Sequence, residues 1–104
     1  MFALVVRFDL RPGAAEDFDR LVAETAPLIR EREPGTLIYT VHGVEGEPGA
    51  RVFYELYRDR SAFDEHERQP HVVRFLQERG RHLSGVRVEF LTPPSGKGLP
   101  DVGD

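Results

Sequence analysis

One stretch of the chain decides the fold: residues 52–66, VFYELYRDRSAFDEH, followed after a short gap by Pro70 and His71. Its first six positions are β-branched, aromatic or leucine, with Glu55 as the exception, and this composition is typical of a buried strand. A polar turn follows and leads into a segment with the pattern of a helix start. The stretch therefore predicts a strand that delivers titratable side chains directly onto a helix.

The helix after this strand is predicted to begin at Ala62. Ser61 precedes it as an N-cap, and Asp64, three residues later, can complete a capping box. Pro70 suits the first turn of a further helix, because the N–H that it lacks would have no partner there. The apolar side of that further helix is expected to carry Val72, Val73, Leu76 and Leu83.

Upstream of this stretch, residues 2–10 predict a first strand that is buried over most of its length. Residues 14–33 follow with apolar positions at helical spacing, and their acids come early and their bases late, as the helix dipole favours. Pro27 lies inside this helical pattern. A kink or a break is therefore expected near Ala23 and Glu24.

Three further strands complete the pattern. Residues 36–43 predict the second strand, and residues 51–58 are expected to pair with it in antiparallel orientation. The polar segment between them, residues 43–50, predicts a hairpin loop longer than a two-residue turn. Residues 86–91 predict the last strand.

The resulting order, β-α-β-β-α-β, is that of a ferredoxin-like α+β fold, a four-stranded antiparallel sheet with its helices on one face. One domain is expected over residues 1–92, and residues 93–104, rich in proline and glycine, are expected to form an extended tail.

The third strand is apolar on both of its faces. Val52, Tyr54 and Leu56 alternate with Phe53 and Tyr57, whereas a sheet with one wet face should alternate apolar with polar residues. A second copy of the same sheet would cover the face without helices. The sequence therefore predicts a homodimer with a two-sheet barrel between the subunits.

Composition excludes several classes of function. The chain has 104 residues, a formal charge of -4 and no cysteine. The acidic balance argues against a nucleic-acid partner, and the lack of cysteine excludes disulfides, thiolate metal sites and a cysteine nucleophile. The apolar start of the chain is too short for a secretory signal, and no segment has the length of a membrane span. We expect a cytoplasmic protein with no membrane partner.

Glu55 is the first candidate for chemistry, because it lies among apolar residues on a strand expected to be central. A carboxylate in that position must be paired or hydrogen-bonded, or its pKa will rise. Two interpretations follow. Glu55 either forms a structural ion pair with Arg7, Arg51 or Arg87, or it takes part in catalysis.

The histidines and tyrosines near this strand are the other candidates. His66 is either a partly exposed helix residue or a general base that faces the gap between helix and sheet. His71 is either a surface residue or a substrate contact, and Tyr39 and Tyr57 are either core residues or substrate contacts. Because His66 and His71 are five residues apart, they do not share one helix face, and a metal site is not expected.

The sequence resembles the antibiotic biosynthesis monooxygenase family of the dimeric α/β-barrel superfamily. The spacing is most similar to the branch that contains quinol monooxygenases and the enzyme that processes the phosphorylated autoinducer signal. The resemblance rests on residues 33–37 (EPGTL), on residues 53–59 (FYELYRD), and on the run Ala62, Phe63, His66, Pro70 and His71.

The resemblance implies a homodimer with a pocket between helices and sheet, in which O₂ oxidises a small quinol or polyketide-like aromatic without flavin, haem or metal. It implies that His66 and Glu55 are catalytic and that Tyr39, Tyr57 and His71 bind the substrate. Deprotonation by a positioned base would make a bound hydroxyarene electron-rich enough to reduce O₂.

The chain departs from the haem-degrading relatives, which use a tryptophan and an axial histidine on the later helix. It has no tryptophan, and the corresponding region near Leu76 is apolar. Haem is therefore not expected as a cofactor.

Two other functions fit the sequence. The first is isomerisation of a small phosphorylated signal molecule, which would need Arg51, Arg58 or Arg74 to face the pocket. The second is a non-catalytic small-molecule-binding barrel, since one fold hosts many functions. A pocket sealed by its own side chains, with Glu55 locked to an arginine and His66 in solvent, would favour this second function.

Overall fold

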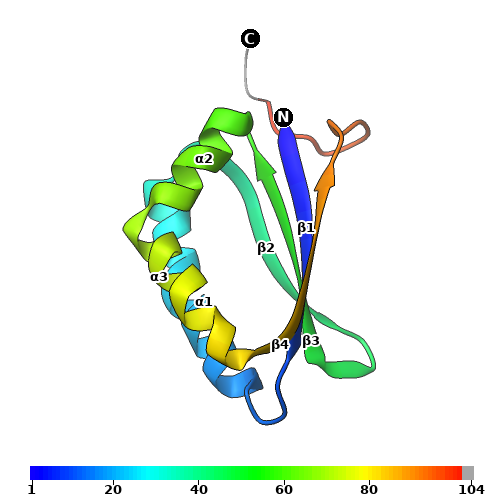
Figure 1. Ribbon diagram of the computed structural model, residues 1–104. Helices are drawn as coiled ribbons and strands as arrows, with labels where there is room; N and C mark the ends of the chain where they lie inside the picture. Colours follow the sequence, from blue (N-terminus) through cyan, green and yellow to red (C-terminus); the bar gives the residue numbers. More distant parts are fainter. Residues whose placement is uncertain (102–104) are drawn as a thin grey trace.

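The structure, a computed structural model, describes residues 1–101 of the chain. Within these residues, a four-stranded sheet forms one layer and three helices pack over one of its faces (Figure 1). In chain order the elements are β1 (Phe2–Leu10), α1 (Ala15–Arg32), β2 (Thr36–Val44), β3 (Glu47–Tyr57), α2 (Arg60–Arg68), α3 (Pro70–Arg79), the 3-10 turn η1 (Gly80–His82) and β4 (Leu83–Leu91).

The strands lie in the order β2-β3-β1-β4, and every neighbouring pair is antiparallel. On β1, Leu4 lies opposite Glu55 of β3 on one side and opposite Phe90 of β4 on the other. The predicted ferredoxin-like α+β fold is therefore confirmed, and Glu55 does lie on a central strand.

Aromatic side chains fix the helix layer against the sheet. Phe8 of β1, Phe18 of α1 and Phe53 of β3 are each at most 1% exposed. The rings of Phe8 and Phe53 meet edge to face with centroids 4.8 Å apart, and Phe18 packs against both. Because buried aromatic rings contribute large apolar areas, this cluster anchors one end of the space between helices and sheet.

The hairpin between β2 and β3 is tighter than the sequence predicts. Only Glu45 and Gly46 connect Val44 to Glu47, which pair with each other, so the expectation of a longer loop is wrong. Gly46 has a φ of 79°, a conformation that glycine adopts without steric cost. A shift in the pairing register between Gly43 and Val44 lets the strands continue closer to the turn.

Helix α1 runs without a break through Pro27, so the predicted break is absent. Proline cannot donate a hydrogen bond to the carbonyl of Ala23. Ala23 and Pro27 are both exposed, so a water molecule can donate a hydrogen bond to the carbonyl of Ala23.

The start of α2 also differs from the prediction. The helix begins at Arg60, and Asp59 is its N-cap, since its carboxylate accepts a hydrogen bond of 2.8 Å from the backbone N–H of Ala62. The predicted cap at Ser61 and the predicted start at Ala62 are wrong. Asp59 provides the same type of cap two residues earlier.

Helix α3 begins at Pro70 as predicted, but its buried side is different. His71, Val72 and Phe75 are buried, whereas Val73 is 39% exposed. Leu83, which was expected on this helix, is the first residue of β4.

The end of the chain contains no helix or strand over residues 92–101, and the last three residues of the expected tail, 102–104, lie outside the described part of the chain. No helix found between residues 1 and 101 has the length and apolar character needed to cross a membrane.

We predict that Gly35→Ala destabilises the protein by about 1–3 kcal/mol, as overpacking typically does. A Cβ atom at residue 35 would lie 2.7 Å from the Cβ atom of Ala62 on α2, so the helix must shift to admit it. Urea denaturation measures the change. Gly43→Ala is the matched control, because its new methyl group would meet nothing within 4 Å. Equal stabilities of the two variants would contradict the close approach.

Candidate active site

His66 lies on the inner face of α2 and is only 5% exposed. Its Nδ1 lies 2.5 Å from Oε1 of Glu33, and its ring packs against Tyr39 and Tyr57 at centroid distances of 5.6 Å and 5.2 Å. A hydrogen bond and two aromatic rings therefore hold the imidazole in one orientation.

Glu33, the residue at which α1 ends, is 6% exposed and holds three hydrogen bonds. Its carboxylate accepts from the hydroxyl of Thr36 at 2.7 Å and binds Nε2 of His71 at 2.5 Å, in addition to His66. Burial acts to raise the pKa of Glu33, but the hydrogen bonds and the charge of His66 outweigh burial and lower this pKa below its ordinary value. Glu33 is therefore a carboxylate near neutral pH.

The ionised Glu33 determines which nitrogen of His66 carries hydrogen. Because a carboxylate only accepts hydrogen bonds, Nδ1 of His66 and Nε2 of His71 must be the donors. In neutral His66 the lone pair is then on Nε2, which lies 3.9 Å from Oε1 of Glu55. Nδ1 of His71, by contrast, is buried and has no hydrogen-bond partner among residues 1–101. His71 thus supports Glu33, while His66 presents a basic nitrogen to Glu55.

Glu55 is a second buried carboxyl group with a different environment. It is 6% exposed, and the hydroxyl of Tyr57 donates a hydrogen bond of 2.5 Å to its Oε1. Burial raises the pKa of Glu55, although the hydrogen bond from Tyr57 and the charge of His66 oppose this effect. Glu55 and Nε2 of His66 are therefore close neighbours, but at 3.9 Å they are too far apart for a direct hydrogen bond.

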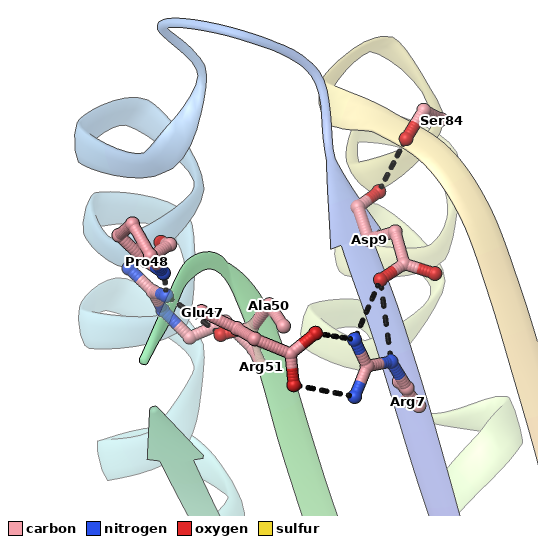
Figure 2. Close-up of polar contacts among 7 residues, drawn as sticks. All are labelled: Arg7, Asp9, Glu47, Pro48, Ala50, Arg51 and Ser84. Carbon is pink, nitrogen blue, oxygen red and sulfur yellow. Dashed lines mark hydrogen bonds and ion pairs between the residues drawn. The ribbon is translucent and has the colours of Figure 1, made fainter. Parts of the chain in front are cut away.

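None of the arginines proposed as structural partners contacts Glu55, so that expectation is wrong. Arg7 lies between Asp9 and Glu47, 2.8 Å from an oxygen of Glu47 (Figure 2). Arg87 pairs with Glu89. The side chains of Arg7 and Arg87 lie on the face of the sheet without helices, whereas Glu55 lies on the helix face.

Arg51 is on the helix face, in the middle of β3 and four residues before Glu55. It forms an ion pair with Asp19 of α1 at 2.9 Å. Its guanidinium also donates to the backbone carbonyls of Pro48 and Ala50 (Figure 2). These contacts fully engage Arg51 in holding α1 to the hairpin.

A cavity of about 110 Å³ lies between the helices and the sheet, next to His66. Its wall is mainly apolar and aromatic, and four ionisable side chains other than tyrosine reach it. The aromatic residues of the wall include Tyr39, Phe53, Phe63, Phe75 and Phe90, and the four ionisable residues are Glu55, His66, Glu67 and Arg79. Such a cavity can hold a small ring and expose it to a base.

Three of the five predicted site residues meet in this cavity: Tyr39, Glu55 and His66. Tyr57 and His71 do not line it. They lie behind Glu55 and Glu33, to which they are hydrogen-bonded. Their predicted role as substrate contacts has no support from this geometry, and they orient the residues in front of them.

Two residues of the site were not predicted from the sequence. Arg79 lines the cavity from the last position of α3, and no pattern in the sequence marks it. Glu33 could have been noticed in the sequence. An acidic residue at the C-terminal end of a helix is disfavoured by the helix dipole, so its presence there indicates stabilising partners.

The arginines considered for a phosphorylated substrate do not line the cavity. Arg74 pairs with Glu24 and Glu78 on the outside of the helix layer. Arg58 lines a separate surface pocket of about 250 Å³. Within residues 1–101, no group of three or more His, Cys, Asp or Glu side chains is placed to hold a metal ion.

Solved structures from several bacteria share this fold. The Rv0793 protein of Mycobacterium tuberculosis is 30% identical, with a TM-score of 0.81 over 93% of this chain and 98% of its own. PA3566 of Pseudomonas aeruginosa is 27% identical, with a TM-score of 0.78 over 90% of this chain and 94% of its own. A Caulobacter crescentus protein, described provisionally as an antibiotic biosynthesis monooxygenase, is 22% identical, with a TM-score of 0.85 over 90% of both chains, and shows the common fold.

At the level of sequence, no curated protein matches the chain. The family model of the antibiotic biosynthesis monooxygenases, however, matches residues 1–78, a range that includes Glu33, Glu55, His66 and His71. The chain therefore belongs to the antibiotic biosynthesis monooxygenase family.

Proposed function

We propose that the protein is a monooxygenase that oxidises a small quinol or related aromatic compound with O₂ and without a cofactor. In this proposal His66 is the base, Glu55 is its proton-exchanging neighbour, and Tyr39 contacts the bound ring. Membership of the family supports the general type of activity. The quinol class of substrate is our inference from the cavity.

The observation that carries this proposal is the orientation of His66. Glu33 holds Nδ1, so the basic Nε2 points to Glu55 at the wall of an aromatic cavity. A histidine with one nitrogen fixed by a carboxylate and the other facing a substrate space is the usual arrangement of a general base.

The proposed reaction begins when Nε2 of His66 takes the hydroxyl proton of a bound quinol. The electron-rich anion then reduces O₂, and one oxygen atom forms a new bond to a ring carbon. The second oxygen atom leaves as water with two hydrogens of the substrate. The quinol becomes a hydroxyquinone, and the four electrons that it loses reduce O₂. The apolar wall shelters the reactive oxygen species from water.

The size of the cavity favours a substrate with one ring. An engineered apolar cavity of about 150 Å³ is large enough to bind benzene. The cavity here, at about 110 Å³, suits a ring of that size after small side-chain movements. A larger polyketide would have to extend past Val88 and Phe90 of β4, which line the cavity and are 43% and 60% exposed.

Two of the three conditions that would favour a non-catalytic barrel are not met. Glu55 is hydrogen-bonded to Tyr57 and not locked to an arginine, and His66 is buried, not solvated. Likewise, the arginines required for a phosphate-binding isomerase lie outside the cavity. These observations support the oxidative proposal over both alternatives.

We also propose that the protein is a homodimer formed through the face of the sheet without helices (Figure 1). Val5 of β1, Ile38 of β2 and Val52 and Tyr54 of β3 point to this face and are half-buried. A second copy of the sheet would bury this apolar surface and complete a two-sheet barrel.

Replacement of His66 tests the proposed function. His66→Ala should lower the rate of O₂ consumption with a one-ring quinol by about 10²–10⁴-fold, the usual contribution of a general base. An oxygen electrode measures the rate, and size-exclusion chromatography checks assembly. His82→Ala is the control, because His82 lies in η1 outside the cavity wall. Unchanged turnover in His66→Ala would exclude the role of His66.

Replacement of Glu33 tests the charge that holds His66. We predict that Glu33→Gln lowers the free energy of unfolding at pH 7 by about 2 kcal/mol, since hydrogen bonds to a charged group are lost. The pKa of Glu33 is lower in the folded protein than its ordinary value of 4.5. The contribution of ionised Glu33 to the free energy of unfolding is therefore complete above pH 4.5. It is lost as the pH falls through the pKa that Glu33 has in the folded protein.

Urea denaturation of wild type and Glu33→Gln at pH 7 and at pH 4 measures this difference, and His66 and His71 are present in both proteins. Glu31→Gln, at an exposed position of the same helix, is the control and should change little. A difference between wild type and Glu33→Gln that is the same at both pH values would show that the charge of Glu33 does not stabilise the fold.

The proposed dimer predicts that Tyr54→Asp gives a folded monomer, because a buried charge without a partner opposes association of the two sheets. Sedimentation velocity measures the oligomeric state. Val73→Asp makes a comparable change on the exposed side of α3 and should leave the dimer intact. A wild-type monomer, or a dimer in both variants, would contradict the proposed interface.

A further inference from the structure

Arg79 is the cation of the cavity that the proposed reaction does not use. Its side chain lines the cavity from the last position of α3, and its guanidinium carbon lies 5.3 Å from the centre of the Phe8 ring. Among residues 1–101 its guanidinium forms no ion pair and no side-chain hydrogen bond, and the carboxyl groups of Glu55 and Glu67 act on its charge only from a distance. Arg79 therefore brings a positive charge to the cavity without a carboxylate in direct contact with it.

Two other arginines near the helix layer, unlike Arg79, are paired with carboxylates. Arg74, on the same helix, is paired with Glu24 and Glu78, and Arg51 is paired with Asp19. A guanidinium that is partly removed from water without a carboxylate is unfavourable, because its five donors lose water and gain little in return. Burial accordingly lowers the pKa of Arg79, against the opposing effects of Tyr39, Glu55 and Glu67, but an arginine keeps its charge near neutral pH.

The acidic residues near the cavity form no direct ion pair with Arg79. The charge of Glu33 is directed to His66, His71 and Thr36. Burial favours the neutral form of Glu55, and Glu67, at the wall of the cavity, forms no ion pair with Arg79. An anionic group of a ligand is thus the partner that the cavity lacks.

We infer that Arg79 binds the carboxylate of an aromatic ligand, and that this ligand is a single ring with a hydroxyl group at the end that faces His66. A planar guanidinium binds a carboxylate through two parallel hydrogen bonds, so it would fix the direction of the ring as well as its affinity. The orientation of the hydroxyl group rests on the proposed function, whereas recognition of the carboxylate does not. Arg79 is in this view the residue that determines the class of substrate.

Binding of 4-hydroxybenzoate and phenol under nitrogen tests the inference without turnover. The two probes differ only in the carboxylate. Wild type should bind 4-hydroxybenzoate about tenfold or more tightly than phenol, as a charge-assisted contact implies. Isothermal titration calorimetry gives both affinities.

In Arg79→Gln the preference for 4-hydroxybenzoate should disappear while the affinity for phenol is kept. Arg79→Lys, which retains the charge but not the two parallel donors, should keep part of the preference. Arg74→Gln, on the exposed side of the same helix, should bind both probes as wild type does. Circular dichroism checks that each variant is folded.

Equal affinity of wild type for the two probes, a preference that persists in Arg79→Gln, or failure of both probes to bind would overturn the inference. Oxygen uptake with hydroquinone and with 2,5-dihydroxybenzoate distinguishes failure of the inference about Arg79 from failure of the proposed monooxygenase function. A preference for the carboxylate without turnover of either compound would contradict only the monooxygenase proposal. Turnover of hydroquinone without a preference for the carboxylate would contradict only the assignment of Arg79.

Discussion

The rest of the structure depends on one buried carboxylate, that of Glu33. It ends α1, receives hydrogen bonds from His66 of α2 and from His71 at the start of α3, and reaches Thr36 at the start of β2. The two carboxylate oxygens of Glu33 thus connect α1 with α2, α3 and β2. A carboxylate removed from water is stable only when such donors replace its hydration, so the four elements must keep their relative positions for Glu33 to stay charged. The same constraint fixes the tautomer and the direction of His66.

The backbone around Glu33 makes this arrangement possible. Gly35 follows two residues later, and its lack of a side chain lets α2 approach until Ala62 fills the space that a Cβ atom would occupy. The carbonyl of Gly35 also accepts a hydrogen bond from the backbone N–H of Arg58, just before α2. The segment from Glu33 to Thr36 therefore connects α1 to β2 and at the same time sets the distance between α2 and the carboxylate that holds His66.

The sequence was sufficient for the order of the elements, because the strands and helices carry their own periodicity and most of them end near a proline or glycine. It was weaker at turns, where Asp59 and Ser61 are both good caps and only the backbone path decides between them. It singled out Glu55 and His66, which share one short stretch and line the same cavity. It did not identify Arg79 as part of the site, and Glu33 appeared only within a family motif. These two residues reach the site from the ends of α1 and α3, and their partners lie far away in sequence, so only the packing of the helix layer brings them together.

The pKa values of the two buried carboxyl groups beside His66 shift in opposite directions, and the proposed reaction uses this difference. Glu33 has three donors, and they outweigh burial and keep it ionised. Glu55 has one close donor, Tyr57, and burial prevails, so its pKa rises. In the proposed reaction, the fixed anion Glu33 holds Nδ1 of the imidazole, and a proton taken from the cavity would arrive at Nε2, on the side of the more readily protonated Glu55.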